Sequence, residues 1–216
     1  MSERTTPVHS RLRTFLLVAG GFFLGVAVTI GGMWLSMYYF VSWVTESDIS
    51  VGENPEGRLF EATAKLAESK NEYERWLALG DVAMWNVDAG SLDKASAFAQ
   101  ELLATADHYR NDWNYGNAIH KSHLVLGRIE LRKGNTNSAV RHLLEAGKTA
   151  GSPQLNSFGP NMTLAKELLD VGERKPVLEY MELCGRFWKN DFGALAKWKQ
   201  MIRSGRVPNF GANLLY

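Results

Sequence analysis

The chain has 216 residues, a formal net charge of +1 and a single cysteine. A nearly neutral chain without a basic stripe gives no electrostatic indication of nucleic-acid binding. One cysteine, Cys184, excludes an intrachain disulfide framework and any metal site built from several cysteines.

Residues 15–44 form the most apolar stretch of the chain, with no Asp, Glu, Lys, Arg or His. A helix of that length rises about 45 Å, whereas the hydrocarbon core of a bilayer is about 30 Å thick. The sequence therefore predicts a single transmembrane helix over 15–44, preceded by a basic tail over 1–14. With no charged group in the span, a proton or ion path through this helix alone is not expected.

The charges on the two flanks predict the orientation of this helix. The tail carries Arg4, Arg11 and Arg13, and the opposite flank is acidic, with Glu46 and Asp48. The positive-inside rule then places the N-terminus in the cytoplasm and the remainder in the periplasm or a lumen. A cleaved signal peptide is the alternative, but its apolar region would span only about 7–15 residues before a small-residue cleavage site.

Two further patterns lie within the predicted membrane helix. Small residues at four-residue spacing allow close contact between helices, either with a second copy or with another subunit, although Gly is common in membrane helices. Aromatic rings near the C-terminal end suit the interface between membrane and water. The small residues are Gly21, Gly25, Ala27 and Gly31, and the aromatic residues are Trp34, Tyr38, Tyr39 and Trp43.

A polar linker over 45–56 precedes the predicted folded domain over 57–216. Asn54 followed by Pro55 is typical of a helix start, with a capping residue and then Pro at the first position. Leu59, Ala62 and Leu66 then recur at helical spacing. No pattern typical of β-strands competes, so an all-α domain is expected.

A pattern of small and large residues recurs along this domain. In the central copy, Leu126 and Gly127 are followed by Gly134 and Ala139. Two antiparallel helices cross closely only where one of them has a small side chain or, as in glycine, no Cβ atom. This requirement explains Gly127 and Ala139. An upstream copy has Trp76, Leu79, Gly80 and Ala95, with extra residues within 85–89, and a degraded downstream copy has Leu164, Ala165, Gly172, Val177 and Cys184.

Residues 72–189 resemble tetratricopeptide repeats in this spacing. The resemblance implies about three helix hairpins and a capping helix, which present a surface for protein partners. Two features depart from the family pattern, because Ala83 and Glu130 stand where an aromatic residue is usual and the Pro after the second helix is missing. Another helix-hairpin repeat or an irregular helical bundle therefore remains an alternative.

The sequence also predicts the segments that follow the central copy. Residues 147–161 are rich in Gly, Pro, Asn and Ser and predict a structured loop, either a connector or a functional segment. A capping helix is expected where Leu195, Trp198 and Ile202 share one face. The tail over 207–216 is apolar, which predicts that it folds back on the last helices or inserts into a neighbouring subunit.

No set of residues indicates catalysis, a cofactor or a metal. His120 and His123 lie three apart with His142 on the partner helix, yet no further ligand completes a known metal pattern, so core or surface packing is the interpretation. The glutamates at 101, 145, 167, 179 and 182 are interpreted as solvated, and Cys184 as a buried packing thiol. Asn161 begins a formal glycosylation sequon whose use would need a eukaryotic lumen.

The sequence thus predicts a membrane-anchored helical-repeat scaffold, an accessory or structural subunit of a larger membrane complex, and not an enzyme. The expected partners are other membrane subunits and the bilayer, with self-association through the membrane helix as a further option and no nucleic acid. A transient assembly factor or chaperone on the periplasmic face is the main alternative. An enzyme with its site in the repeat groove is the third.

Overall fold

The computed structural model describes residues 55–215, and its contacts divide the chain into Met1–Glu53 and Asn54–Tyr216. The predicted basic tail, membrane helix and most of the linker lie outside the described residues, as do all the small and aromatic residues singled out there. Between 55 and 215, no helix is both long and apolar enough to cross a membrane.

The described residues are all-α, as predicted, and contain no strand. Among these residues, the two longest helices are Glu72–Asp88 and Tyr115–Arg132. In chain order the helices are α2 (Pro55–Ala67), α3 (Glu72–Asp88), α4 (Leu92–Thr105), the 3-10 turn η1 (Ala106–Tyr109), α5 (Tyr115–Arg132), α6 (Thr136–Gly147), α7 (Pro153–Phe158), α8 (Thr163–Asp170), α9 (Arg174–Cys184), α10 (Ala194–Arg203) and the 3-10 turn η2 (Gly211–Leu214).

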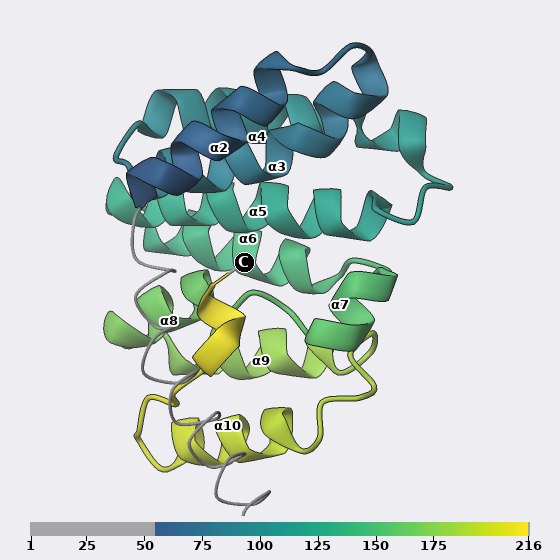
Figure 1. Ribbon diagram of the computed structural model, residues 1–216. Coiled ribbons are helices and arrows are strands. Elements are labelled where there is room, and N and C mark those ends of the chain that lie inside the picture. The colour runs from purple at the N-terminus through teal and green to yellow at the C-terminus, as the bar shows by residue number, and fades with distance from the viewer. Residues whose placement is uncertain (1–54, 216) are drawn as a thin grey trace, which may run out of the picture. The chain divides into compact units, whose positions relative to one another are not determined.

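Consecutive helices pack as pairs, and the pairs stack on one another (Figure 1). The pairs are α3 with α4, α5 with α6, and α8 with α9. Contacts of α5 with α3 and α8, and of α6 with α9, join each pair to the next. The helix α2 covers α3 at one end of the stack and α10 packs on α9 at the other, so each pair buries its apolar face against a neighbour.

Local capping explains where several of these helices begin. The Asn71 side chain accepts a hydrogen bond from the Glu74 amide, and the Glu74 carboxylate accepts bonds from the Lys70 amide and the Asn71 side chain. This reciprocal arrangement satisfies donors at the start of α3 that the helix itself leaves open. Upstream of α3, α2 begins at Pro55, the position that the Asn–Pro pair predicts.

The tight turns within the pairs depend on glycine. Gly90, Gly134 and Gly172 have φ angles of +77°, +82° and +93°, in the left-handed region that other residues rarely adopt. Each of the three lies in the connection that directly follows the first helix of a pair. The turn at Gly90 comes later than in the other copies because α3 continues to Asp88, eight residues beyond Gly80, whereas α5 ends at Arg132, five residues beyond Gly127.

The core is largest towards the C-terminal end. One cluster joins α6, α8, α9 and α10 and includes Tyr180, Trp188 and Trp198, whereas two smaller clusters join α3, α4 and α5. Cys184 belongs to the larger cluster and is fully buried, which confirms the prediction of a packing thiol.

The segment 147–161 differs in part from its prediction as a structured, non-helical loop, because it contains the short helix α7. Ser152 caps this helix by accepting a hydrogen bond from the Leu155 amide, and Pro153 occupies the first turn. The same residues that indicated a loop also form a standard helix start. The segment is closely packed, since a Cβ atom at Gly116 would lie 1.9 Å from the Gly151 carbonyl oxygen.

Candidate functional site

The C-terminal tail packs on a surface formed by the first helices of the pairs. Around its last residues lie Met84 and Trp85 of α3, Leu124 and Arg128 of α5, and Thr163 of α8. We call this surface the tail face. Phe210 is buried and packs edge-on against Trp198, with ring centroids 5.0 Å apart. The tail therefore folds back on its own domain, which is one of the two predicted arrangements (Figure 1).

Hydrogen bonds from Asn213 hold this tail in place. Its side-chain amide donates to the Phe158 and Pro160 carbonyl oxygens at 3.0 and 2.9 Å, and its own carbonyl accepts from the Met162 amide at 2.8 Å. Two of these bonds are made by the Asn213 side-chain amide and the third by its backbone carbonyl oxygen, and together they fix the tail more firmly than apolar contact alone would. A cavity of about 90 Å³ remains between the tail and the helices.

At the tail face, the buried side chain of Arg128 links three helices through ion pairs. The Arg128 guanidinium on α5 contacts Asp88 of α3 at 2.7 Å and Glu167 of α8 at 2.8 Å, and its side chain is 8% exposed. Burial alone would lower the pKa of Arg128, but the two carboxylates more than offset it and raise that pKa. Glu167 is therefore a partly buried member of an ion triad around Arg128, rather than the fully solvated residue that the sequence predicted.

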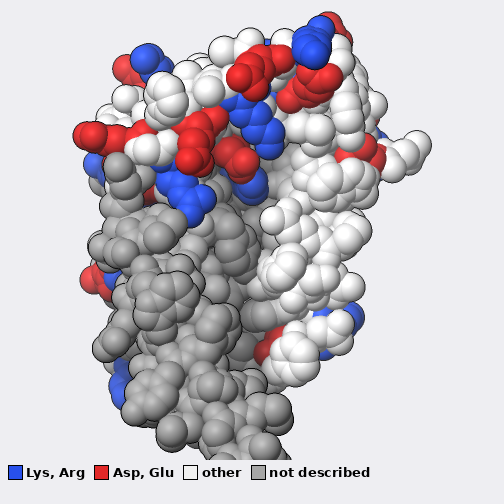
Figure 2. Space-filling view, viewed as in Figure 1, with Lys and Arg blue, Asp and Glu red and all other residues white. Residues whose placement is uncertain are grey.

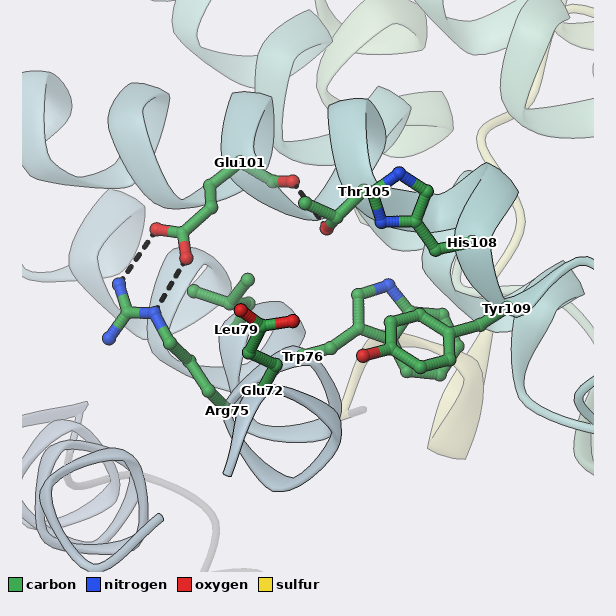
Figure 3. Close-up of a pocket in the computed structure, with 8 residues that line it drawn as sticks. All are labelled: Glu72, Arg75, Trp76, Leu79, Glu101, Thr105, His108 and Tyr109. Atoms are coloured by element: carbon green, nitrogen blue, oxygen red, sulfur yellow. Dashed lines mark hydrogen bonds and ion pairs between the residues drawn. The ribbon is translucent and has the colours of Figure 1, made fainter. Parts of the chain in front are cut away.

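A second cavity, of about 300 Å³, opens between α3 and the end of α4 (Figure 3). We call it the α3–α4 cavity. Its lining combines an ion pair, two aromatic rings and a few polar groups. The lining residues are Glu72, Arg75, Trp76, Leu79, Glu101, Thr105, His108 and Tyr109.

The two ends of the α3–α4 cavity differ in chemistry. At one end the Arg75 guanidinium donates two hydrogen bonds to the Glu101 carboxylate, at 2.6 and 2.7 Å. This pairing raises the pKa of Arg75, chiefly through the hydrogen bond to Glu101. At the other end the Trp76 and Tyr109 rings pack with centroids 4.5 Å apart, next to His108. Such a site can combine apolar contact with directed hydrogen bonds.

The three histidines that the sequence singled out do not converge. The His120 Nδ1 lies 3.0 Å from the Ala146 carbonyl oxygen, and its Nε2 accepts from the Asn161 amide. His123 and His142 face each other instead, with 3.1 Å between their Nδ1 atoms. Burial lowers the pKa of all three, that of His120 to about 4. In residues 55–215 no group of three or more His, Cys, Asp or Glu side chains could hold a metal ion.

Most of the residues assigned to repeat packing are buried. Trp76, Leu79, Gly80, Ala95, Gly127 and Ala139 are buried, whereas Leu126 is half-buried and Gly134 is exposed in its turn. The sequence did not single out Arg128 or Asn213, because their partners lie about 40 to 55 positions away. Nor did it indicate that Trp76 lines a cavity as well as the core.

Comparisons with protein-family models, with curated proteins and with solved structures gave no match. Function is therefore inferred from the residues of the chain itself.

Proposed function

We propose that this protein is a membrane-anchored helical-repeat scaffold that binds protein partners, as an accessory or structural subunit of a larger membrane complex. Its domain is a tetratricopeptide-like array. The supporting residues are the small ones at the helix crossings, since a Cβ atom at Gly127 would lie 2.4 Å from the Leu164 side chain. The apolar, uncharged span over 15–44 supports the anchor.

One observation carries the binding role: the tail face already holds a short segment of polypeptide, the 3-10 turn η2 with the residue that follows it. On the tail face itself, Leu214 and Leu215 lie beside the helices and the Thr163 hydroxyl donates to the Leu214 carbonyl oxygen at 3.5 Å. The Asn213 hydrogen bonds and the Phe210 side chain anchor the segment on either side, to the connection before α8 and to α10. A surface that binds a short segment of its own chain has the shape and donors to bind a similar short segment of another protein.

The visible charges favour recognition by contact over recognition by long-range attraction. Positive and negative side chains are interspersed over α2 to α4 (Figure 2). The surface over α7 shows few charges, in agreement with the absence of charged residues from 149 to 165. Trp113 and Phe158 are 57% and 66% exposed. Exposed aromatic side chains of this kind are enriched where proteins meet.

Gentle detergent extraction of the full-length protein, followed by size analysis and mass spectrometry, tests the proposal. A permanent subunit is expected to co-purify with partners in fixed stoichiometry. Replacing Gly21 and Gly25 with Leu is expected to loosen the complex if the membrane helix contributes a contact. Partners in substoichiometric amounts would instead favour a transient assembly factor, and a monodisperse chain without partners would contradict the proposal.

A further inference from the structure

The α3–α4 cavity contains a buried hydrogen-bond donor without an acceptor. Trp76 is 2% exposed, and its Nε1 has no hydrogen-bond partner. In Figure 3 this nitrogen lies on the edge of the indole that faces Thr105 and His108 across the cavity. A buried donor without a partner costs free energy, which a ligand oxygen in the cavity would recover.

The charges around the cavity indicate which ligands fit. Glu101 neutralises Arg75 through two short hydrogen bonds, so the guanidinium does not act as an uncompensated positive charge. Glu72 adds a further carboxylate to the lining. An anionic ligand would meet this negative charge near the Trp76 donor, whereas a neutral carbonyl oxygen would accept the hydrogen bond without that repulsion.

An acceptor lies near the donor, which points to an amide. Thr105 donates its hydroxyl proton to the Glu101 carbonyl oxygen at 2.7 Å, so the Thr105 oxygen can accept a hydrogen bond from a ligand. Leu79 and the ring of Tyr109 provide apolar lining beside these groups. A donor and an acceptor beside apolar lining match the C=O and N–H of a peptide unit.

We propose that the α3–α4 cavity is a binding site for a neutral peptide unit, supplied by an uncharged segment of a partner polypeptide. The carbonyl oxygen of the segment accepts a hydrogen bond from Trp76 Nε1, and a neighbouring amide donates to Thr105 Oγ1. This assignment rests on the proposed scaffold function for the source of the peptide. The chemistry itself rests on the residues of the cavity.

The test is a titration of the full-length protein, labelled with ¹⁵N at tryptophan and held in lipid nanodiscs, with N-acetylglycinamide. This blocked, uncharged peptide unit is small, so the expected dissociation constant is in the millimolar range. The indole N–H resonance of Trp76, identified by its absence in Trp76→Phe, is expected to move downfield and to saturate. Trp188 is the internal control, because its Nε1 is also buried without a partner but lines neither this cavity nor that beside the tail.

Two matched variants separate the cavity from the rest of the surface. Thr105→Phe fills the cavity and is expected to abolish the shift of Trp76. Ala104→Phe adds the same ring at the adjacent, exposed position and is expected to leave the shift unchanged. In Trp76→Phe the donor is lost, and saturation transfer to the acetyl methyl group of the probe is expected to show binding weakened about five- to tenfold.

Three results would overturn the assignment: a Trp76 resonance that does not move, an equal shift of Trp188, or binding that survives Thr105→Phe. Tighter binding of sodium acetate than of N-acetylglycinamide would contradict the neutral ligand. The titration needs no partner protein and co-purification needs no cavity ligand, so failure of one is distinguishable from failure of the other.

Discussion

At the scale of single residues, Arg128 shows how a buried charge can join elements that are distant in sequence. Its two carboxylate partners come from α3 and α8, so the guanidinium ties the first helices of successive pairs together beside the tail face. An isolated buried charge is expensive, and the triad is tolerated only because each member compensates another.

Arg128→Met is therefore expected to destabilise the domain by about 3 kcal/mol, because it removes the cation from Glu167 and leaves Asp88 with the longer contact to Arg132, at 4.0 Å. This is near the low end for a buried pair, since the Asp88 and Glu167 side chains are 27% and 28% exposed. Chemical unfolding followed by tryptophan fluorescence measures the loss. Lys166→Met, which removes an exposed pair with Asp170, is the control and should cost less than about 0.5 kcal/mol.

His120 makes the stability depend on pH. Its neutral ring donates from Nδ1 to Ala146 and accepts from the Asn161 amide at Nε2, so a second proton would oppose that amide. Burial lowers its pKa from 6.5 to about 4. Between these values the unfolded state binds more protons, so stability is full above pH 6.5 and falls as the pH drops towards 4.

The expected loss from His120 across this pH range is up to about 3 kcal/mol. Unfolding free energies at pH 7 and pH 5 measure about 2 kcal/mol of it. The drop between them should be smaller in His120→Asn, which keeps a donor near the Nδ1 position. His123 and His142 have lowered pKa values as well and leave some pH dependence in the variant. An identical drop in variant and wild type would contradict this role.

At the scale of elements, the helix crossing at Gly127 determines how closely α5 and α6 approach. A Cβ atom there would lie 2.4 Å from Leu164 Cδ2 and 3.0 Å from His142 Cβ. Gly127→Ala is expected to destabilise the domain by about 1–3 kcal/mol, despite the better helix propensity of Ala. Gly185→Ala is the matched control, since its nearest contacts are at 3.5 Å or more, and chemical unfolding should show little or no loss for it.

The tail gives a second prediction at this scale. Phe210 is 2% exposed and packs on Trp198, whereas Leu215 is 59% exposed. Phe210→Ala is expected to cost about 3–5 kcal/mol, because it leaves a cavity in the core. Leu215→Ala should cost less than about 0.5 kcal/mol. Chemical unfolding compares the two, and equal losses would contradict the packing of the tail described above.

The helices and their turns could be predicted from local signals, whereas their side-chain partners could not. Glycine at 90, 134 and 172 marks turns because the signal depends on φ at one residue. The helix α7 was missed because Ser152 and Pro153 indicate a loop as readily as a helix start. Arg128 and Asn213 depend on pairings about 40 to 55 positions apart, which no local pattern encodes.

The burial of individual residues within a repeat also depends on contacts that local spacing does not encode. Leu126 was assigned to packing by its place beside Gly127, yet it is half-buried while Leu124 and Val125 are almost fully buried. The spacing predicts which helix face points inward, but the neighbouring helices decide which residue at the edge of that face is covered. The α3–α4 cavity escaped prediction for a similar reason, because the spacing placed Trp76 at a packing position.

At the scale of the whole molecule, the single cysteine allows the predicted topology to be tested directly. Cys184 is buried, and burial raises the pKa of its thiol, so the native protein should react poorly with thiol reagents. Phe192 is 99% exposed, and Phe192→Cys offers one reactive site in the described domain. If residues 15–44 anchor the chain with its N-terminus in the cytoplasm, this site lies on the outer side of the membrane.

A membrane-impermeant maleimide applied to intact cells, or to spheroplasts if an outer envelope blocks access, is expected to label Phe192→Cys before lysis. Val171→Cys, 58% exposed in a different connection, should be labelled in the same way, whereas the native chain should remain unlabelled. Labelling of both variants only after lysis would place the domain in the cytoplasm and contradict the predicted orientation. Because the native chain controls for Cys184, the result depends on the side of the membrane and not on reactivity within the core.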